Sequence, residues 1–319
     1  MVRIAHATLL AALAALASPP GYPADAFPQK PVRLVIPFAP GGGTDILARA
    51  VSDKLAETLG ATIVIDNRPG AGGTLGSALV AQAAPDGYTF LFTSASYTFN
   101  PNFYKLTYDP VKDFKPVTMF GSSPNLLIVH PSLPVKSVKE LLALARKRPG
   151  DINAGHAGRG SNIHLTTALF LHKAKIKVTE VPYKGGGPSQ IALMSGEIQM
   201  LLPSITSALP FVKSGRMRAL GVTSKKRAPL LPNVPTIEES GVPGYVKVGW
   251  YALFAPAAVP EPIINRVYQA VSKVLKDPEI VKRIEADGTT AEGQPPREFE
   301  AFVNSELAEW ANLIREMKL

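Results

Sequence analysis

Hydrophobic residues follow two different spacings along the chain, and the first clear unit contains both. The continuous apolar run 32–36 is typical of a buried parallel strand. In the segment 46–59 the apolar residues recur at helical spacing, and Gly60 supplies a helix stop. Between them lies the stretch 37–45, Pro-Phe-Ala-Pro-Gly-Gly-Gly-Thr-Asp. The pattern predicts a strand, a glycine loop and a helix in immediate succession.

The glycine loop 37–45 is suited to an anionic ligand. Its glycines carry no Cβ, so backbone N–H groups stay accessible at the positive end of the helix dipole. The same residues could also serve only as a tight connection, with Thr44 as the N-cap and Asp45 as the charge that neutralises the dipole. The loop by itself leaves both interpretations open.

The same order of strand, loop and helix recurs through the first third of the chain. The segments 61–66 and 88–92 are predicted as strands, and the glycine-rich loop 67–74 follows the first of them. The second predicted strand ends at Thr93, Ser94 and Ala95. Hydroxyls and free N–H groups at the carboxyl ends of strands are where open α/β sheets bind ligands.

The middle of the chain repeats these units with different residues. We expect the strand 125–130 to leave a first lobe and the strand 249–256 to return to it. Between them, the glycine-containing loops 154–161 and 182–187 each precede a helix. Each lobe thus offers glycine loops and helix starts to a common cleft.

Capping residues mark further helix starts. Ser137 and Glu140 form a capping box, and Asp277 is followed by a proline at the first helical position. We also expect helices from about Glu261 and from near Arg297.

The first 26 residues have the order of a secretory signal peptide. Arg3 precedes the apolar run 8–17, and the A-x-A site Ala24–Ala26 predicts a mature chain that begins near Phe27. The apolar run is too short to span a bilayer. The chain has no cysteine, which excludes disulfides and thiolate catalysis. An exported chain without disulfides suits the bacterial periplasm.

The length beyond the signal peptide predicts two α/β lobes, because it exceeds the usual core of one domain. We place the first lobe at residues 27–127 plus 249–319 and the second at 128–248. Residues 128–248 hold 17 Lys and Arg against 6 Asp and Glu, whereas the rest of the chain holds 17 against 19. This excess of positive charge could attract anions or could form a solvated face, and both interpretations stay open.

Several catalytic and cofactor motifs are missing. The chain has no P-loop, no complete dinucleotide fingerprint, no G-x-S-x-G and no H-E-x-x-H. His156, His164 and His172 are spaced eight residues apart, which does not place them as neighbouring metal ligands on one helix face. The basic clusters are short and lack a DNA-reading motif. We therefore predict no cofactor, no metal and no nucleic-acid partner.

Seven stretches, in this order, carry a family resemblance. They are Pro40-Gly41-Gly42-x-x-Asp45, Asn67-Arg68-Pro69-Gly70-Ala71-Gly72-Gly73, Ala84-Pro85-Asp86-Gly87-Tyr88-Thr89, Asn100-Pro101, Gly160-Ser161-x-x-His164-Leu165, Val181-Pro182-Tyr183-Lys184-Gly185 and Trp250-Tyr251-x-Leu253-Phe254-Ala255-Pro256. Together they resemble the substrate-binding proteins of tripartite tricarboxylate transporters, also called the Bug family.

The resemblance implies an α/β periplasmic binding protein of type II, a two-lobe Venus flytrap with two crossing hinge strands. It implies a monomer that traps a small carboxylate by lobe closure and delivers it to the permease subunits of the transporter, without a catalytic step. Two alternatives stay open. One is an exported enzyme that acts on a small organic acid with His156 or His164 as base, and the other is a sensor that presents its closed form to a receptor.

The resemblance also places the ligand site. The first lobe would contribute Phe38, Ala39, Pro40, Gly41, Gly42, Gly43, Asp45, Thr93, Ser94 and Ala95. The second lobe would contribute His156, Arg159, Gly160, Ser161, His164, Tyr183, Pro203 and Ser204.

This chain departs from the family pattern at three of these positions. Compared with the family pattern, the loop that holds His156 and Arg159 has these two basic residues in addition and lacks an aromatic residue. Pro203 stands where family members often have an aspartate. We therefore expect a more cationic cleft and a ligand without an ammonium group, such as a di- or tricarboxylate or an aromatic acid. An exposed loop arginine is the alternative for Arg159. Asp45 would fix the glycine loop by hydrogen bonds rather than meet the carboxylate.

Overall fold

Two separate β-sheets organise the molecule. The computed structural model describes residues 27–319, so the predicted signal peptide 1–26 lies outside the described residues. The first sheet has the order β11-β4-β10-β3-β1-β2. Its strands are β1 (Val32–Ile36), β2 (Ile63–Asn67), β3 (Thr89–Ser94), β4 (Phe114–Pro124), β10 (Val248–Pro256) and β11 (Thr290–Ala291). β1 pairs in parallel with β2 and β3, whereas β10 and β11 make antiparallel pairs.

The second sheet has the order β7-β6-β8-β5-β9. Its strands are β5 (Leu126–Val129), β6 (Asn153–His156), β7 (Thr179–Pro182), β8 (Met200–Leu201) and β9 (Arg218–Val222). β6 pairs in parallel with β7 and β8, and β5 is antiparallel to both of its neighbours. The predicted lobe division at 127/128 falls within β5, which belongs to this second sheet.

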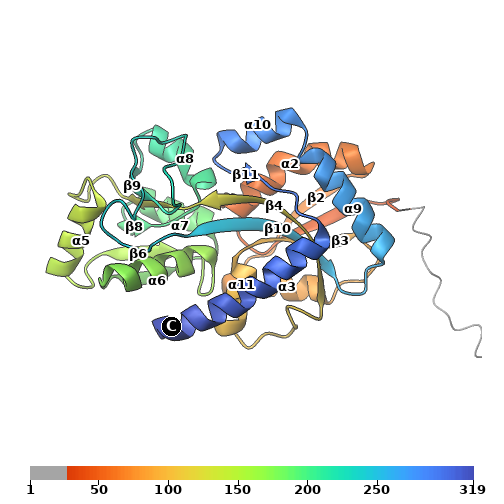
Figure 1. Cartoon of the computed structure of the whole chain (residues 1–319), viewed down its shortest axis with the longest axis horizontal. Coiled ribbons are helices and arrows are strands. Elements are labelled where there is room, and N and C mark those ends of the chain that lie inside the picture. Colours follow the sequence, from red (N-terminus) through yellow and green to blue (C-terminus); the bar gives the residue numbers. More distant parts are fainter. Residues whose placement is uncertain (1–26) are drawn as a thin grey trace, which may run out of the picture.

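Helices cover both faces of each sheet (Figure 1). They are α2 (Gly43–Leu59), α3 (Thr74–Ala81), α4 (Ser96–Phe99), α5 (Val138–Lys147), α6 (Asn162–Ala174), α7 (Gly186–Met194), α8 (Ile205–Lys213), α9 (Glu261–Val274), α10 (Pro278–Ala286) and α11 (Pro296–Met317), with short 3₁₀ turns η2 (Ala71–Gly73) and η3 (Asn100–Asn102). Several predicted starts are confirmed: the Ser137 hydroxyl accepts from Glu140 N–H, and the Asp277 carboxylate accepts from two N–H groups of α10. No helix within residues 27–319 has the length and apolar character needed to cross a membrane.

The apolar cores follow from the alternation of side chains along the strands. In β1, Leu34 and Ile36 join a buried cluster with α2, α9 and α10, whereas Val35 faces the opposite way and joins a cluster with α3 and α11. This second cluster continues to Leu127 and Val129 of β5 and to helices α5 and α6. The other face of the second sheet packs on α7 and α8. One core thus extends across both sheets.

Two long strands connect the sheets. β4 and β10 pair from Pro124↔Val248 to Phe114↔Pro256, and β4 leads directly into β5 (Figure 1). The returning strand 249–256 is confirmed as β10. The spacing of hydrophobic residues did not predict β4, because Pro116, Gly121 and Pro124 interrupt its pattern.

Candidate ligand-binding site

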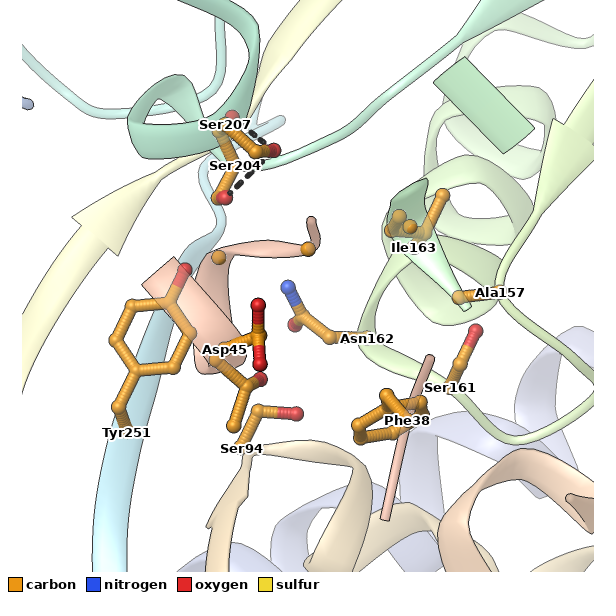
Figure 2. A pocket seen from close by; sticks show the side chains of 14 residues that line it. Phe38, Asp45, Ser94, Ala157, Ser161, Asn162, Ile163, Ser204, Ser207 and Tyr251 are labelled. Atoms are coloured by element: carbon orange, nitrogen blue, oxygen red, sulfur yellow. Dashed lines mark hydrogen bonds between the residues drawn. The ribbon is translucent and has the colours of Figure 1, made fainter. Parts of the chain in front are cut away.

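A small pocket, about 50 Å³ in volume, lies between the two sheets beside β10 (Figure 2). Its lining consists of Phe38, Gly42, Gly43, Thr44, Asp45, Ser94, Ala157, Ser161, Asn162, Ile163, Gly186, Ser204, Ser207 and Tyr251. These residues come from both halves of the molecule. A ligand here would therefore contact both.

Four helix N-termini meet at this pocket. α2 begins at Gly43, α7 begins at Gly186, and the N-cap residues Ser161 of α6 and Ser204 of α8 also line the pocket. Each N-terminus carries a partial positive charge and unpaired backbone N–H groups. Among the residues that line the pocket there is no Lys or Arg, and Asp45 is the one charged side chain. The pocket can therefore attract an anion through helix dipoles and hydroxyls rather than through side-chain cations.

Gly43 is required where α2 approaches the hinge strand. A Cβ at this position would lie 2.3 Å from both the Ser204 hydroxyl oxygen and the Tyr251 phenol oxygen. Only glycine lets the first turn of α2, the start of α8 and β10 come this close. The glycine loop is thus shaped by its packing as well as by its N–H groups.

The carboxylate of Asp45 holds the glycine loop in place. One of its oxygens accepts from Gly41 N–H at 3.0 Å, and the other accepts from Arg49 Nε at 3.1 Å and Asn67 Nδ2 at 3.0 Å. Burial favours a higher pKa for Asp45, but the hydrogen bonds from Arg49, Gly41 and Asn67 outweigh it and lower the pKa. The expectation that Asp45 fixes the loop by hydrogen bonds is confirmed.

Hydroxyl groups line the opposite side of the pocket. The hydroxyls of Ser204 and Ser207 lie 3.2 Å apart, and Tyr251 points toward them (Figure 2). Burial raises the pKa of Tyr251, which keeps its phenol protonated and able to donate. Asn162 adds an amide whose Nδ2 donates to Asn125 at 3.3 Å and whose buried Oδ1 has no partner among the described residues. The pocket therefore offers both donors and acceptors to a ligand.

The structure brings some of the predicted site residues to the pocket and places others elsewhere. Those in the lining are Phe38, Gly42, Gly43, Asp45, Ser94, Ser161 and Ser204. Those outside it are Ala39, Pro40, Gly41, Thr93, Ala95, His156, Arg159, Gly160, His164, Tyr183 and Pro203. The lining also contains Ala157, which lies inside the predicted glycine-containing loop 154–161. Lining residues that sequence reasoning missed are Thr44, Asn162, Ile163, Gly186, Ser207 and Tyr251. Two of these residues lie at predicted helix starts: Gly186 begins α7, and Asn162 follows the N-cap of α6. Helix starts were therefore a signal that could have found them. Tyr251 lies within one of the stretches that carry the family resemblance.

Loops of the two halves touch directly beside the pocket. Ala39 N–H donates to the Lys184 carbonyl at 3.2 Å, and the Tyr104 hydroxyl donates to the Arg159 carbonyl at 3.0 Å. Gly187 packs so closely that a Cβ there would lie 2.1 Å from the carbonyl oxygen of Pro40. These contacts join the two halves beside the pocket.

His156, His164 and Glu180 form a cluster behind the loop 156–161. Their possible ligand atoms lie within 4.8 Å of one another. Each histidine Nδ1 accepts a backbone N–H, from Gly158 and Gly160 respectively, both at 3.2 Å. A neutral ring that accepts at Nδ1 carries its proton on Nε2, which therefore has no free lone pair for a metal. The cluster is arranged for hydrogen bonding rather than for metal ligation.

His164 is also poorly placed to act as a base. Burial, together with the nearby His156 and Arg159, lowers the pKa of His164 to about 3. The ring packs edge-on against Phe103 and does not line the pocket. A packing role accounts for its position.

Comparison with known proteins identifies a consistent set of relatives. Residues 47–319 match the family model described as "Tripartite tricarboxylate transporter family receptor". Protein BugT of Bordetella pertussis is 33% identical over 296 residues, which cover 92% of this chain and 91% of BugT.

Solved structures give the same result. The periplasmic binding protein BugD superposes with a TM-score of 0.89 at 32% identity, covering 92% of this chain and 99% of BugD. An R. palustris protein solved with adipate gives 0.89 at 35% identity, covering 92% of this chain and 98% of that one. MatC from Rhodopseudomonas palustris, solved with malate, gives 0.85 at 35% identity, covering 90% and 100%.

Proposed function

The chain belongs to the tripartite tricarboxylate transporter receptor family, and we propose that it is a periplasmic receptor that captures a small organic carboxylate between its two lobes. The observation that carries this proposal is the meeting of four helix N-termini at one pocket whose lining has no Lys or Arg. The relatives solved with adipate and malate support carboxylates as the ligand class.

The ligand carboxylate would be held by backbone N–H groups and hydroxyls, with ordered water completing its hydrogen bonds. Ser161, Ser204 and Tyr251 offer hydroxyls at the pocket wall. Asp45 cannot meet the carboxylate directly, because two like charges at contact distance repel. Both Asp45 oxygens already accept hydrogen bonds, which also leaves little for a ligand ammonium group. An acid without an ammonium group fits best.

Delivery to the permease subunits of a tripartite transporter follows from the family, and we propose it for this chain as a monomer. Cleavage near Ala26 is part of the same proposal, and N-terminal sequencing of the exported protein should begin at Phe27. A sensor would use the same closed form with another partner. The enzyme alternative is not favoured, because the family and the matched structures are binding proteins.

The direct test is a thermal-shift panel of C4 to C6 dicarboxylates, citrate, aromatic acids, aspartate and glutamate at low salt. A ligand at a hundred times its dissociation constant should stabilise the protein by about 2.7 kcal/mol. Any co-purified ligand is first removed by unfolding and refolding. Stabilisation by one class of acid supports the proposal, and no shift with any acid contradicts it.

A further inference from the structure

The positive charge concentrated in residues 128–248 does not reach the pocket. These residues hold 17 Lys and Arg against 6 Asp and Glu, yet no Lys or Arg lines the pocket. Six of the cations lie instead where α5 and α6 end. We call these six residues the basic patch: Arg146, Lys147, Arg148, Lys173, Lys175 and Lys177.

Hydrogen bonds join the two segments that carry the basic patch. Gly150 N–H donates to the Lys177 carbonyl at 3.2 Å, and Arg146 Nη2 donates to the Ala174 carbonyl at 3.1 Å. The segments lead into β6 and β7, which lie side by side as a parallel pair. The six cations therefore belong to one continuous surface at the amino ends of these two strands.

The basic patch lies at the opposite end of the second sheet from the pocket. The pocket residues Ala157 and Gly186 follow the carboxyl ends of β6 and β7, whereas the patch precedes the amino ends of these strands. In Figure 1, α5 lies at the end of the molecule opposite to α9. A partner bound to the patch would thus leave the pocket uncovered.

The basic patch carries more charge than its surroundings neutralise. Its six residues are exposed, and none forms an ion pair within residues 27–319. Asp151 follows the first segment, and Glu238 accepts from Gly244 N–H, beside Lys173. The C-terminal ends of α5 and α6 attract cations, but each carries only about half a negative charge. A surplus of about three positive charges remains after both carboxylates and both helix ends are counted.

Long, exposed side chains without a fixed ionic partner suit a broad anionic surface rather than a single small anion. An anionic bilayer presents headgroup charges over its whole surface, and each nearby Lys or Arg strengthens attachment to it by about fivefold. A surplus of about three charges therefore corresponds to about a hundredfold preference for an anionic over a neutral bilayer.

We propose that the basic patch docks the receptor on the anionic phospholipid headgroups of the membrane. This inference rests on the proposed function, because a receptor that delivers to a permease works beside a bilayer. Attachment through the far end of the second sheet holds the protein at the surface while the pocket stays open to its acid. The attachment is reversible and weakens with salt, because it depends on exposed charges.

The test measures co-sedimentation with vesicles of phosphatidylcholine alone and of an equimolar mixture with phosphatidylglycerol, at physiological ionic strength. The mixed vesicles should bind the wild-type protein about a hundredfold more tightly than the neutral ones. The combined variant K147Q, K173Q and K177Q should lose most of this preference, because it removes about as much charge as the surplus. Raising the salt concentration should weaken the binding of the wild-type protein.

The combined variant K273Q, K276Q and K282Q is the matched control. It removes the same charge from exposed lysines beside the first sheet, and none of the three forms an ion pair within the part of the chain that the structure describes. Lys273 lies in the last turn of α9, as Lys147 does in α5. The control should keep vesicle binding within about threefold of wild type.

Each other outcome would overturn the proposal. Equal losses in both combined variants would show that net charge, not the basic patch, attracts the vesicles. Equal binding to mixed and neutral vesicles would show that headgroup charge is not recognised. Binding only to vesicles that also hold the permease subunits would assign the patch to a protein partner.

The thermal-shift panel of acids, run on the same variants, separates this inference from the proposed function. Acid binding without vesicle binding would overturn the membrane docking alone. Vesicle binding without acid binding would overturn carboxylate capture alone. Unfolding curves confirm that each variant has folded.

Discussion

Two glycine loops meet at the pocket, and they are held in different ways. The loop 41–43 is braced within its own half, because Asp45 accepts three hydrogen bonds and Asn67 Nδ2 also donates to the Phe38 carbonyl at 3.0 Å. The loop 185–187 begins α7, its Gly186 carbonyl accepts from the Ser189 hydroxyl at 2.9 Å, and it lies against the first loop. The first loop is therefore held by a charged network, and the second by neutral hydrogen bonds to its own helix and by contact with the first.

The two sets of contacts should therefore have separate effects on stability and on binding. Damage to the Asp45 network should weaken the folded protein and the site together. Damage to the contact between the loops should leave each half folded and remove the closed state.

The largest expected effect is from Gly187→Ala. The new methyl would lie 2.1 Å from the carbonyl oxygen of Pro40, and backbone cannot yield without separating the loops. We expect about a hundredfold loss of carboxylate affinity. Stability should stay equal or rise slightly, since alanine is the better helix former.

Gly42→Ala is the matched control for Gly187→Ala. A Cβ at Gly42 finds its nearest neighbour, Gly186 N, at an ordinary 3.6 Å, so this variant should close normally, and because Gly42 lines the pocket it should lose some affinity but much less than Gly187→Ala. Calorimetric titration of both variants with a carboxylate ligand measures the two affinities. Unchanged affinity in Gly187→Ala would mean that the loops need not touch for binding.

The second effect is from Asp45→Asn. An amide replaces an acceptor that holds Gly41 N–H, Arg49 and Asn67, so the free energy of unfolding should fall by about 1–3 kcal/mol at pH 7. Because the folded-state pKa of Asp45 is lowered, this contribution is present above the ordinary pKa of an aspartate and is lost as pH falls through the folded value.

Denaturant unfolding of wild type and Asp45→Asn across pH checks this prediction. The difference in unfolding free energy between the two proteins should be largest near pH 7 and should disappear in acid. Binding abolished with no loss of stability would instead indicate that Asp45 contacts the ligand directly.

The smallest effect on binding is expected from Tyr251→Phe, which tests the contribution of the hinge strand β10 to the site. Removing one phenol donor from the pocket should weaken carboxylate binding by about three- to tenfold with little change in stability. Tyr245→Phe is its control, because that buried hydroxyl donates to the Thr166 carbonyl at 2.9 Å and does not line the pocket. It should cost stability and leave affinity unchanged, and the reverse pattern would contradict the assignment.

Much of the fold could be predicted because local signals agree with the final packing. The strand, glycine loop and helix around Gly43 and the cap at Asp277 were both visible in the sequence. The crossing strand β4 was not visible, because its prolines and glycine interrupt the strand pattern and its pairing with β10 is what makes it a strand.

The site was predicted in part for a similar reason. Gly158 and Gly160, with φ of +105° and +71°, turn the loop so that Ser161 caps α6 at the pocket while the Arg159 carbonyl meets Gly72. Arg159 is therefore outside the pocket lining, which contains no Lys or Arg, and the expected cationic cleft is absent from that lining. Tyr251 was missed because a hinge strand, not a strand end, brings it to the site.

The most direct measurement is a crystal structure of the protein with a bound diacid. The account predicts that the inner carboxylate lies within hydrogen-bonding distance of N–H groups at the starts of the helices that meet at the pocket, and that no Lys or Arg contacts it. An inner carboxylate held by a basic side chain, or an acid bound outside this pocket, would contradict it.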